Sequence, residues 1–473
     1  MTTDCTGQQY LFQAPGRREV VAAFNGGAIS SDGGVLLLRQ VDRIRGIVRQ
    51  FASCFDDYRD PDQSEHSVED LLRQRILGLA LGYEDLNDHE DLRHDPLLAV
   101  AVGKQDPTGR SRKRERDRGK ALAGKSSLHR LESGHWDGDP SDRYCKIQIQ
   151  PEAVDRFFVD QFLSAHKRRP RQWIILDLDA TDDPLHGNQE GRFFHGYYGG
   201  YCYLPLYIFA GHHLLCARLR PSNIDASAGS VEELSRIVGQ IRSRWPKVEI
   251  LVRADSGFAR ESLMAWCSQN QVHYLFGLAR NARLEKALDP TFDEVFELCS
   301  ESGEPERLYH EWMYSTLGSW SGERRVIGKA EITLRGENPR FVVTSLPRDR
   351  FDARTIYEDL YCARGDMENR IKEQQLDLFS TRTSAHRMQV NQVRLWLSSV
   401  AYMLMSELRR LGLKGTAWAG ARPSTLRDKL LKIGARVRVS VRKVWVALAT
   451  GHPYESLFAH VYQQLQRAGP VTA

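Results

Sequence analysis

Residues 173–179 have the sequence Trp-Ile-Ile-Leu-Asp-Leu-Asp, and the part of the chain that decides the fold begins with them. A short apolar run of this kind is typical of a buried strand. From this point onward, segments with strand patterns alternate with segments at helical spacing. We expect strands at 201–210, 213–219, 248–255 and 272–277, and helices at 231–245 and 260–270.

The order of these elements predicts the fold class. Three early strands, a helix and a fourth strand is the order of a ribonuclease H-like core, and residues 166–279 would form its first part. Residues 280–350 alternate in β fashion, with strands at 326–334 and 341–344, as an inserted sheet would. A helical pattern runs from Thr355 to Leu411 with a break near Ser380, so residues 351–415 would supply the closing helices. We predict an α/β multidomain protein whose core is interrupted by a β-rich insertion.

Composition places the chain among ordinary globular proteins. Hydrophobic residues make up 41% and charged residues 27%, which excludes a disordered chain. The eight cysteines show no C-x-x-C pair and are expected to be reduced and mostly buried. The N-terminus lacks the pattern of a signal peptide, and the apolar stretch Leu395–Ser406 is too short to span a membrane. We therefore expect a cytoplasmic protein.

Basic residues gather in two segments, although the net charge is only +5. The first segment, Arg110–Lys120, contains seven Lys or Arg, among them Arg112, Lys113 and Arg114. The second lies in residues 416–473, where Arg436, Arg438 and Arg442 would share one face of a strand and Val437, Val439 and Val441 the other. DNA phosphate is the expected partner of both segments, and a solvated surface is the plainer alternative.

The N-terminal region has a mainly helical pattern. Apolar residues recur at helical spacing along Val68–Leu81, and Ser126–Glu132 could open a second helix of a helix-turn-helix-like unit. Together with the first basic segment, these patterns predict a mainly helical DNA-binding region over residues 1–165.

Carboxylates stand at strand ends, where the active sites of α/β proteins gather. Asp177 and Asp179 share one face of the first strand, and Asp255 follows the strand 248–255 at a turn. Paired carboxylates in an apolar setting are favourable only beside a positive charge. Two-metal cleavage of a phosphodiester needs such oxygen ligands from distant segments. Each acid taken alone could equally be a turn or capping residue.

A third acid lies on the late helix. Tyr361, Arg364, Glu368 and Lys372 step by three, four and four residues, so they line one helical face. Taken alone, this spacing more often marks a surface ion pair.

One phosphate-loop pattern is rejected. Residues Gly119–Ser126 match G-x-x-x-x-G-K-[ST], but the preceding residues 111–118 are too basic to form the buried strand that such a loop requires. We expect no ATP site.

In combination, the acids resemble those of a known family. The chain resembles DDE transposases with the Tyr-Arg-Glu helix signature of bacterial insertion sequences, most closely insertion-sequence family 1380. The resembling stretches are 24–34, 82–95, 176–187, 253–258 and 357–382. The resemblance implies that Asp179, Asp255 and Glu368 are the catalytic, metal-holding acids. Asp177 is the alternative for the first of them.

The same resemblance implies the remaining roles. Tyr361 and Arg364 would hold phosphate, whereas the Lys of the signature falls at Gln375 and the nearest Lys is Lys372. Two Mg²⁺ or Mn²⁺ ions and no ATP would serve the reaction. The partners would be double-stranded DNA, both terminal inverted repeats and target, and a second copy of the chain in the DNA complex. The expected location is the bacterial cytoplasm, in association with the nucleoid.

The resulting expectation is cut-and-paste DNA transposition by metal-dependent cleavage and strand transfer. The alternatives are an inactive or domesticated DNA-binding protein of the same fold, and a metal-dependent nuclease without strand transfer. Trp320, in the β-rich region, would either stack on a flipped base or, as is commoner, pack in the core.

Overall fold

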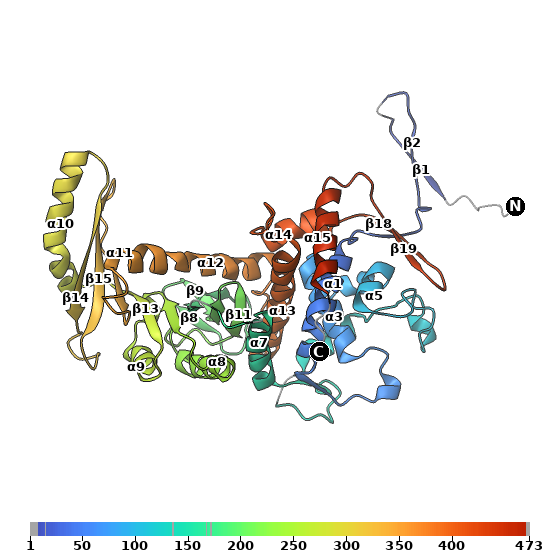
Figure 1. Ribbon diagram of the computed structural model, residues 1–473. Coiled ribbons are helices and arrows are strands. Elements are labelled where there is room, and N and C mark those ends of the chain that lie inside the picture. The colour runs from blue at the N-terminus through green and yellow to red at the C-terminus, as the bar shows by residue number, and fades with distance from the viewer. Residues whose placement is uncertain (1–7, 15, 135–136, 167, 171–172, 470–473) are drawn as a thin grey trace. The chain divides into compact units, whose positions relative to one another are not determined.

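A computed structural model describes residues 8–14, 16–134, 137–166, 168–170 and 173–469 of the chain (Figure 1). Its contacts divide the chain into two units. Unit 1 comprises residues 1–150, 377–379 and 400–473, and unit 2 comprises residues 151–376 and 380–399. The C-terminal residues therefore group with the N-terminal ones, which differs from the five sequence ranges above. The reason is that strand β18 (Ala435–Val439) pairs with β3 (Ala28–Ser30) and helix α15 (Glu455–Ala468) packs on α1 (Val35–Arg45).

Unit 2 is built on a nine-stranded sheet with the order β11-β10-β6-β12-β13-β17-β15-β14, to which β16 adds beside β15. The strands are β6 (Ile174–Ala180), β10 (Leu206–Ala210), β11 (His213–Arg218), β12 (Ile250–Ala254), β13 (His273–Leu278), β14 (Arg307–Tyr314), β15 (Arg324–Thr333), β16 (Gly336–Glu337) and β17 (Arg340–Thr344). A separate small sheet has the order β7-β9-β8, with β7 (Asp183–Pro184), β8 (Phe193–His195) and β9 (Gly200–Tyr203).

Strands β6, β12 and β13 run parallel at the centre of the large sheet, and β10 and β11 add to β6 in antiparallel fashion. All five residues of β12 are buried, as expected for a strand covered on both faces. The expected strands at 173–179, 213–219, 248–255 and 272–277 are confirmed within one or two residues at most ends. The expected strand 201–210 is divided into β9 and β10.

Helices cover both faces of this sheet (Figure 1). One cluster of buried side chains joins the sheet to α7 (Pro151–Ala165), α8 (Ser230–Arg244), α9 (Glu261–Gln269) and α10 (Ala282–Ser302). A second cluster, on the other face, joins Leu251 and Leu275 to Ile356 and Tyr357. The helices expected at 231–245 and 260–270 are confirmed as α8 and α9.

The β-rich region differs from the expectation in two respects. Its first part is the 21-residue helix α10, whose Asn281 side chain accepts hydrogen bonds from the backbone N–H groups of Arg283 and Leu284. Its strands extend the main sheet instead of forming a sheet of their own, because β17 pairs with β13 along four residue pairs.

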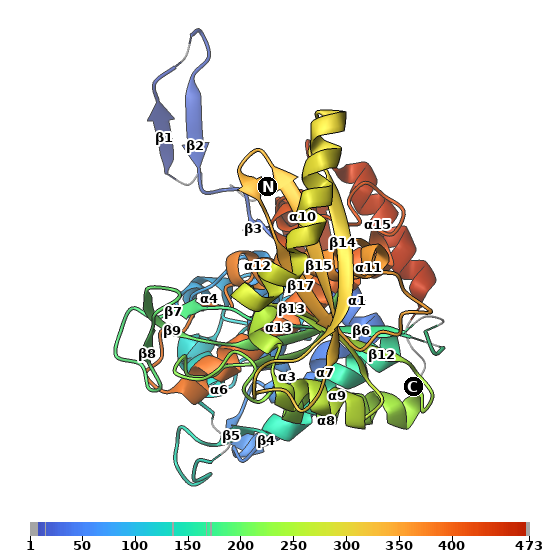
Figure 2. The same ribbon diagram turned by 90° about the vertical axis from the view of Figure 1, so that its left-hand side faces the viewer.

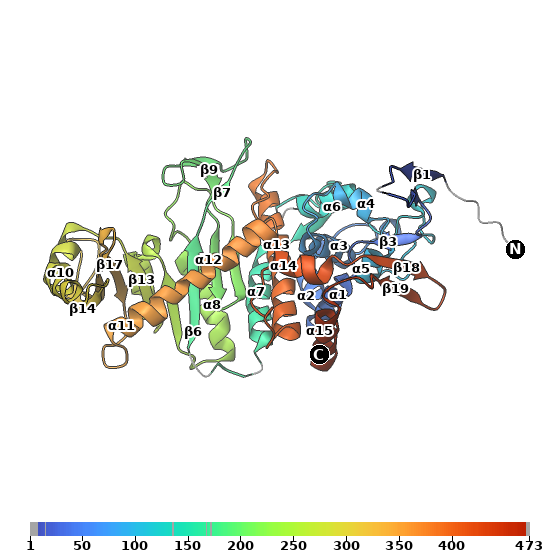
Figure 3. The same ribbon diagram turned by 90° about the horizontal axis from the view of Figure 1, so that it is seen from above.

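The late helical run crosses the sheet diagonally (Figure 3). It consists of α11 (Ala353–Thr355), the π-helical turn η4 (Ile356–Tyr361), the 3₁₀ turn η5 (Cys362–Arg364), α12 (Gly365–Lys372) and the π-helical turn η6 (Glu373–Asp377). After the expected break near Ser380, α13 (Met388–Gly412) begins in unit 2 and continues into unit 1. The 3₁₀ turn η3 (Ser256–Phe258) follows β12.

Unit 1 is mainly helical in its N-terminal part. Its helices and 3₁₀ or π turns are α1, α2 (Ile47–Ala52), η1 (Pro61–Gln63), α3 (Val68–Leu81), α4 (Asp88–Leu92), α5 (Pro96–Val102), η2 (Glu115–Asp117), α6 (Lys125–Ser133), α14 (Pro423–Leu426), η7 (Arg427–Leu431) and α15. Its strands are β1 (Gln9–Phe12), β2 (Val20–Ala23), β3, β4 (Phe55–Asp57), β5 (Ile147–Ile149), β18 and β19 (Val444–Leu448). Helix α3 has the expected limits and begins with a capping box between Ser67 and Asp70.

The C-terminal strand is shorter than expected. β18 ends at Val439 and turns into β19, so Val437 is buried whereas Val441 is fully exposed in the turn. The expected two-faced strand is therefore correct only for residues 435–438, and Arg442 lies outside the strand. Across the described ranges, no helix is both long enough and apolar enough to cross a membrane.

Candidate active site

The two acids of β6 have different surroundings. Asp177 is 2% exposed and forms a two-pronged ion pair with Arg253 of the neighbouring strand β12. The Arg253 Nε donates to Asp177 Oδ1 at 2.6 Å, and its Nη2 donates to Oδ2 at 2.9 Å. Because Asp177 and Arg253 are register partners in parallel strands, this pair is built into the sheet. Both carboxylate oxygens of Asp177 are thus already engaged by a cation.

The negative charge of Asp179, two residues further on, is less fully balanced by a nearby cation. Its side chain is 14% exposed, and its Oδ2 lies 3.5 Å from Nη1 of Arg364. Burial raises the pKa of Asp179 to about 7, because the opposing effect of Arg364 is not sufficient and the charges of Asp255 and Glu368 add to the rise. A carboxylate with this pKa lacks a sufficient positive partner, which is typical of functional sites.

Asp255 follows β12 directly and begins the turn η3. Its Oδ1 accepts a hydrogen bond of 2.8 Å from the N–H of Gly257, so one oxygen orients the turn while the charge of the group still acts on Asp179. Gly257 suits this position because a Cβ there would lie 3.0 Å from that same oxygen.

The helical run brings the third acid to the same place. The Nη2 of Arg364 donates to Oε1 of Glu368 at 2.9 Å, while its Nη1 faces Asp179. Arg364 therefore lies between two of the expected acids. The hydroxyl of Tyr361 lies against Gly277 of β13, where any Cβ would collide with it.

The lysine position of the helix does not join this group. Lys372 is exposed at the end of α12, and no described ion pair involves it. Gln375 is half-buried, and its amide donates to the backbone carbonyl of Asp182 at 3.1 Å. Gln375 thus ties the helical run to the segment that follows β6.

Arg253 was not among the site residues expected from the sequence, although it connects the elements that carry the acids. Besides its ion pair, it donates to the carbonyls of Leu360 and Ala363. These carbonyls belong to the turns η4 and η5, where departure from regular α-helix leaves backbone acceptors to be satisfied. One buried side chain thus connects β6, β12 and the helical run that carries Arg364 and Glu368.

The fit of this site to divalent metal ions rests on its donor set. Asp179, Asp255 and Glu368 supply hard oxygen ligands of the kind that Mg²⁺ and Mn²⁺ prefer. The raised pKa of Asp179 marks a place where a cation would be stabilised. No three His, Cys, Asp or Glu side chains in the described parts of the chain are close enough to hold an ion together as they stand. Arg364 takes the position between two of the acids.

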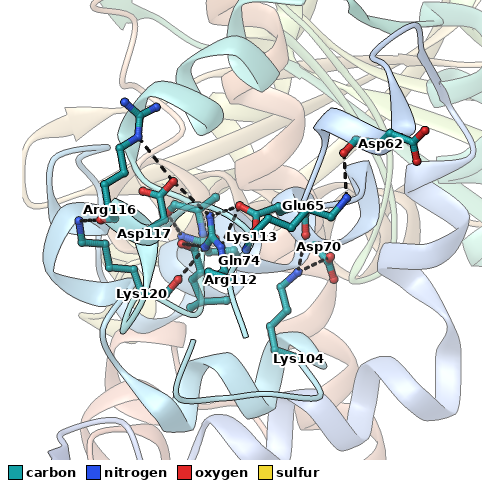
Figure 4. Close-up of polar contacts among 12 residues, drawn as sticks. Asp62, Glu65, Asp70, Gln74, Lys104, Arg112, Lys113, Arg116, Asp117 and Lys120 are labelled. Carbon is teal, nitrogen blue, oxygen red and sulfur yellow. Dashed lines mark hydrogen bonds and ion pairs between the residues drawn. The ribbon is translucent and has the colours of Figure 1, made fainter. Parts of the chain in front are cut away.

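The first basic segment, in unit 1, is partly structural (Figure 4). The guanidinium of Arg112 pairs with Glu65 at 2.9 Å and donates to the carbonyls of Lys120 and Leu122. Lys113 donates from its ammonium group to the carbonyl of Asp62 at 2.8 Å. Arg112 therefore folds the loop, whereas Arg114 is exposed.

The three arginines singled out in the second basic segment are exposed to solvent. Arg436 and Arg438 are exposed on β18, and Arg442 is exposed in the turn to β19.

The residues before the rejected phosphate-loop pattern, 111–118, form turns and the 3₁₀ helix η2, not a strand. Helix α6 opens after Gly124, as the sequence indicated for a helix near Ser126.

Comparisons with known proteins give a family match along nearly the whole chain. A family model described as "Transposase DDE domain group 1" matches residues 12–470. No curated protein matches the chain. The chain has a likeness to the cryo-EM structure of the piggyBac transposase synaptic complex with hairpin DNA, which covers 93% of this chain and 82% of that one at 11% identity. The TM-score of that likeness is 0.40.

Proposed function

Because the chain belongs to the family Transposase DDE domain group 1, we propose that it is the transposase of a bacterial insertion sequence, of the kind in insertion-sequence family 1380. In this proposal it binds the terminal inverted repeats of the element, cleaves the DNA there and joins the freed 3′ ends to a target. The observation that carries the proposal is the position of Asp179 and Glu368 on either side of Arg364, with the charge of Asp255 beside them.

We propose further that the centre of unit 2 is a ribonuclease H-like core. The strand order β11-β10-β6-β12-β13, with three antiparallel strands followed by two parallel ones, supports this assignment. Strands β14–β17 with α10 would be the insertion, and the run from α11 to α13 would supply the closing helices.

The proposed catalytic acids are Asp179, Asp255 and Glu368, which would hold two Mg²⁺ or Mn²⁺ ions. When bound, such ions supply activation of the attacking oxygen and stabilisation of the leaving oxygen. Asp177 has the different role of counter-ion to Arg253, which supports Asp179 as the first acid. ATP has no part in this scheme.

The remaining site residues would act on the DNA backbone. Tyr361 and Arg364 lie beside the acids and would bind and orient the phosphate of the cleaved bond. Lys372, exposed on α12, would contact phosphate further along the strand. Bound in this way, the DNA would be held in a fixed position relative to the acids. Holding the reacting groups in the right geometry in advance lowers the barrier to the reaction.

Recognition of the element ends is proposed for the helical N-terminal region. Non-specific contacts to phosphate would come from exposed basic side chains, namely Lys113, Arg114, Arg436, Arg438 and Arg442. In the complex we propose two copies of the chain, one for each end of the element, acting in the bacterial cytoplasm on nucleoid DNA.

The test compares Glu368→Gln with the wild type on DNA that contains the inverted repeats flanking the gene. Gln keeps the shape of Glu368 and removes its charge, so nicking should fall at least about 100-fold while the gel-shift affinity stays within about twofold. Asp366→Asn is the matched control, because Asp366 lies on the same helix and is 74% exposed. It should nick at the wild-type rate.

Each alternative gives a different outcome. Equal loss of nicking and binding in Glu368→Gln would make Glu368 structural and contradict the proposal. Wild-type binding without nicking in Mg²⁺ or Mn²⁺ would favour an inactive DNA-binding protein. Nicking without joining to a target plasmid would favour a nuclease.

A further inference from the structure

A hairpin-like excursion leaves the main sheet of unit 2 between β6 and β10. Residues 183–203 form the small sheet β7-β9-β8, which projects from the body of unit 2 (Figures 2 and 3). We call residues 183–203 the aromatic hairpin. Strands β8 and β9 pair from Phe193 to His195, and the turn between them, residues 196–199, contains two glycines.

The aromatic hairpin exposes large aromatic side chains. Phe193 is 41% exposed, Phe194 60%, Tyr197 86% and Tyr201 45%. Phe194 and Tyr201 are cross-strand partners, and their rings lie edge to face with centroids 5.6 Å apart. Phe194 and Tyr201 share one face of the hairpin, Phe193 points to the opposite face because side chains alternate along a strand, and Tyr197 lies in the turn. Exposed aromatic rings gathered on so short a segment are typical of a binding surface. The cross-strand contact thus fixes the positions of the Phe194 and Tyr201 rings relative to each other.

A cation accompanies the rings. The guanidinium carbon of Arg192 lies 3.8 Å from the centroid of the Tyr201 ring, and its Nη1 donates to the carbonyl of Gly187 and to Oδ1 of Asn188 at 2.7 Å each. Proteins that bind single-stranded nucleic acid combine aromatic rings, on which bases stack, with positive side chains for the backbone. The aromatic hairpin has both parts.

The hairpin also reaches the candidate active site. The hydroxyl of Tyr198 lies 3.4 Å from the carbonyl oxygen of Ala180, the residue that follows Asp179. Burial and the charges of Asp182 and Asp179 raise the pKa of Tyr198 to about 12, in agreement with this position. The Tyr198 ring in turn contacts Tyr197, with centroids 5.0 Å apart. Tyr197 is thus connected through Tyr198 to the strand that carries Asp179.

Trp320, the other aromatic considered for base stacking, has a different setting. It lies in the loop between β14 and β15, edge-on to Tyr314 with a centroid distance of 5.7 Å, and packs against the core while only partly buried. This agrees with the commoner expectation of a core residue.

We propose that the aromatic hairpin is a stacking platform for unpaired DNA bases next to the cleaved bond. The identity of the ligand as DNA rests on the proposed function. Displacing bases from a duplex costs the free energy of unstacking and unpairing, and rings that accept the displaced bases would offset this cost. Stacking is tolerant of sequence, because every base has a flat face.

The test uses a single-stranded oligonucleotide of eleven thymidines, with 2-aminopurine at the centre, in Ca²⁺ buffer. Stacking quenches 2-aminopurine, so the wild type should quench it on binding. Phe194→Ala and Tyr197→Ala should each weaken binding about tenfold, the size expected for loss of one stacked base. Tyr197→Phe keeps the ring and should bind like the wild type. Phe296→Ala, at a 65% exposed aromatic on α10, is the matched control and should also bind like the wild type.

The proposal is overturned if the wild type leaves the fluorescence unchanged, if both alanine variants bind like the wild type, or if Phe296→Ala is equally weakened. Melting curves identify any variant that has lost its fold, and the strong exposure of Tyr197 makes its truncation a safe second variant. Quenching by a wild-type protein that cannot nick the element ends would support the platform while contradicting the proposed function. Nicking by the wild type, together with alanine variants that bind and quench like the wild type, would contradict the platform and leave the proposed function standing.

Discussion

Replacing Asp179 with Asn removes a carboxylate that the metal-free protein accommodates poorly. The pKa of Asp179 rises from an ordinary 3.8 to about 7, because of burial and the nearby acids. Since each tenfold change in an ionisation constant corresponds to about 1.4 kcal/mol, the ionised group costs the folded protein at most about 4 kcal/mol. The pKa of about 7 already includes the attraction of Arg364, and Asn forms different hydrogen bonds from those of a protonated carboxyl group, so we expect a net gain of roughly 1–3 kcal/mol above pH 7.

The sign of the pH dependence follows from the raised pKa. Below about pH 4 the carboxyl group is protonated in both the folded and the unfolded chain, so the variant should match the wild type. Between about pH 4 and pH 7 the folded protein holds a proton that the unfolded chain has released, so wild-type stability falls as the pH rises. The advantage of Asp179→Asn should therefore grow over this window and stay constant above it.

Thermal unfolding with chelator at pH 4, 6 and 8 measures this difference, with about 2–4 °C expected for each kcal/mol in a unit of this size. Adding Mn²⁺ at pH 8 should raise the melting temperature of the wild type but not that of Asp179→Asn. Asp366→Asn serves as the control, since its exposed carboxylate should leave both curves unchanged. If the difference in melting temperature between the wild type and Asp179→Asn were the same at pH 4, 6 and 8, Asp179 would titrate as a solvated group, and the reasoning would be refuted.

Two further predictions concern arginines. In Arg253→Lys, the lysine cannot keep the two-pronged ion pair with Asp177 or reach both helical carbonyls. Nicking should therefore fall about 10- to 100-fold while DNA affinity is retained. A loss of DNA affinity without a loss of nicking would contradict this prediction. Arg112→Ala should lower the melting temperature of the protein, whereas the double variant Arg114→Ala/Arg118→Ala should leave it unchanged. The double variant should instead flatten the dependence of log affinity on log salt by about 0.9 per lost contact, and an unchanged slope would assign both side chains to plain surface.

Sequence patterns predict the central strands well because those strands are buried on both faces. The runs Ile174–Leu178 and Ile250–Ala254 are apolar apart from Asp177 and Arg253, and the buried strand β10 is apolar throughout. Helix α10 was missed, although its buried residues Leu284, Leu288 and Val295 stand at helical spacing. Its internal Pro290 and the β patterns that follow it concealed that signal.

The roles of charged residues depend on partners that are distant in sequence. Arg253 lies 76 residues after Asp177 and 107 before Leu360, so only the folded sheet shows that it joins them. Arg112 is one of seven basic residues in its segment, and nothing local distinguishes it from Arg114 until Glu65, 47 residues earlier, is placed beside it. The exposed rings of the aromatic hairpin had a local signal, the run Arg-Phe-Phe-His-Gly-Tyr-Tyr at 192–198, which is unusually aromatic for a glycine-rich loop.

The continuity of the nine-stranded sheet has a mechanical consequence. Strand β17 is hydrogen-bonded to β13, and β13 to β12, each along four residue pairs, so a continuous ladder connects strands β14–β17 to the strand that leads to Asp255. Bending at either junction would break a ladder of backbone hydrogen bonds. Strands β14–β17 are therefore a rigid extension of the central strands, and a force applied at the loop between β14 and β15 would be transmitted through the sheet to the strand that precedes Asp255.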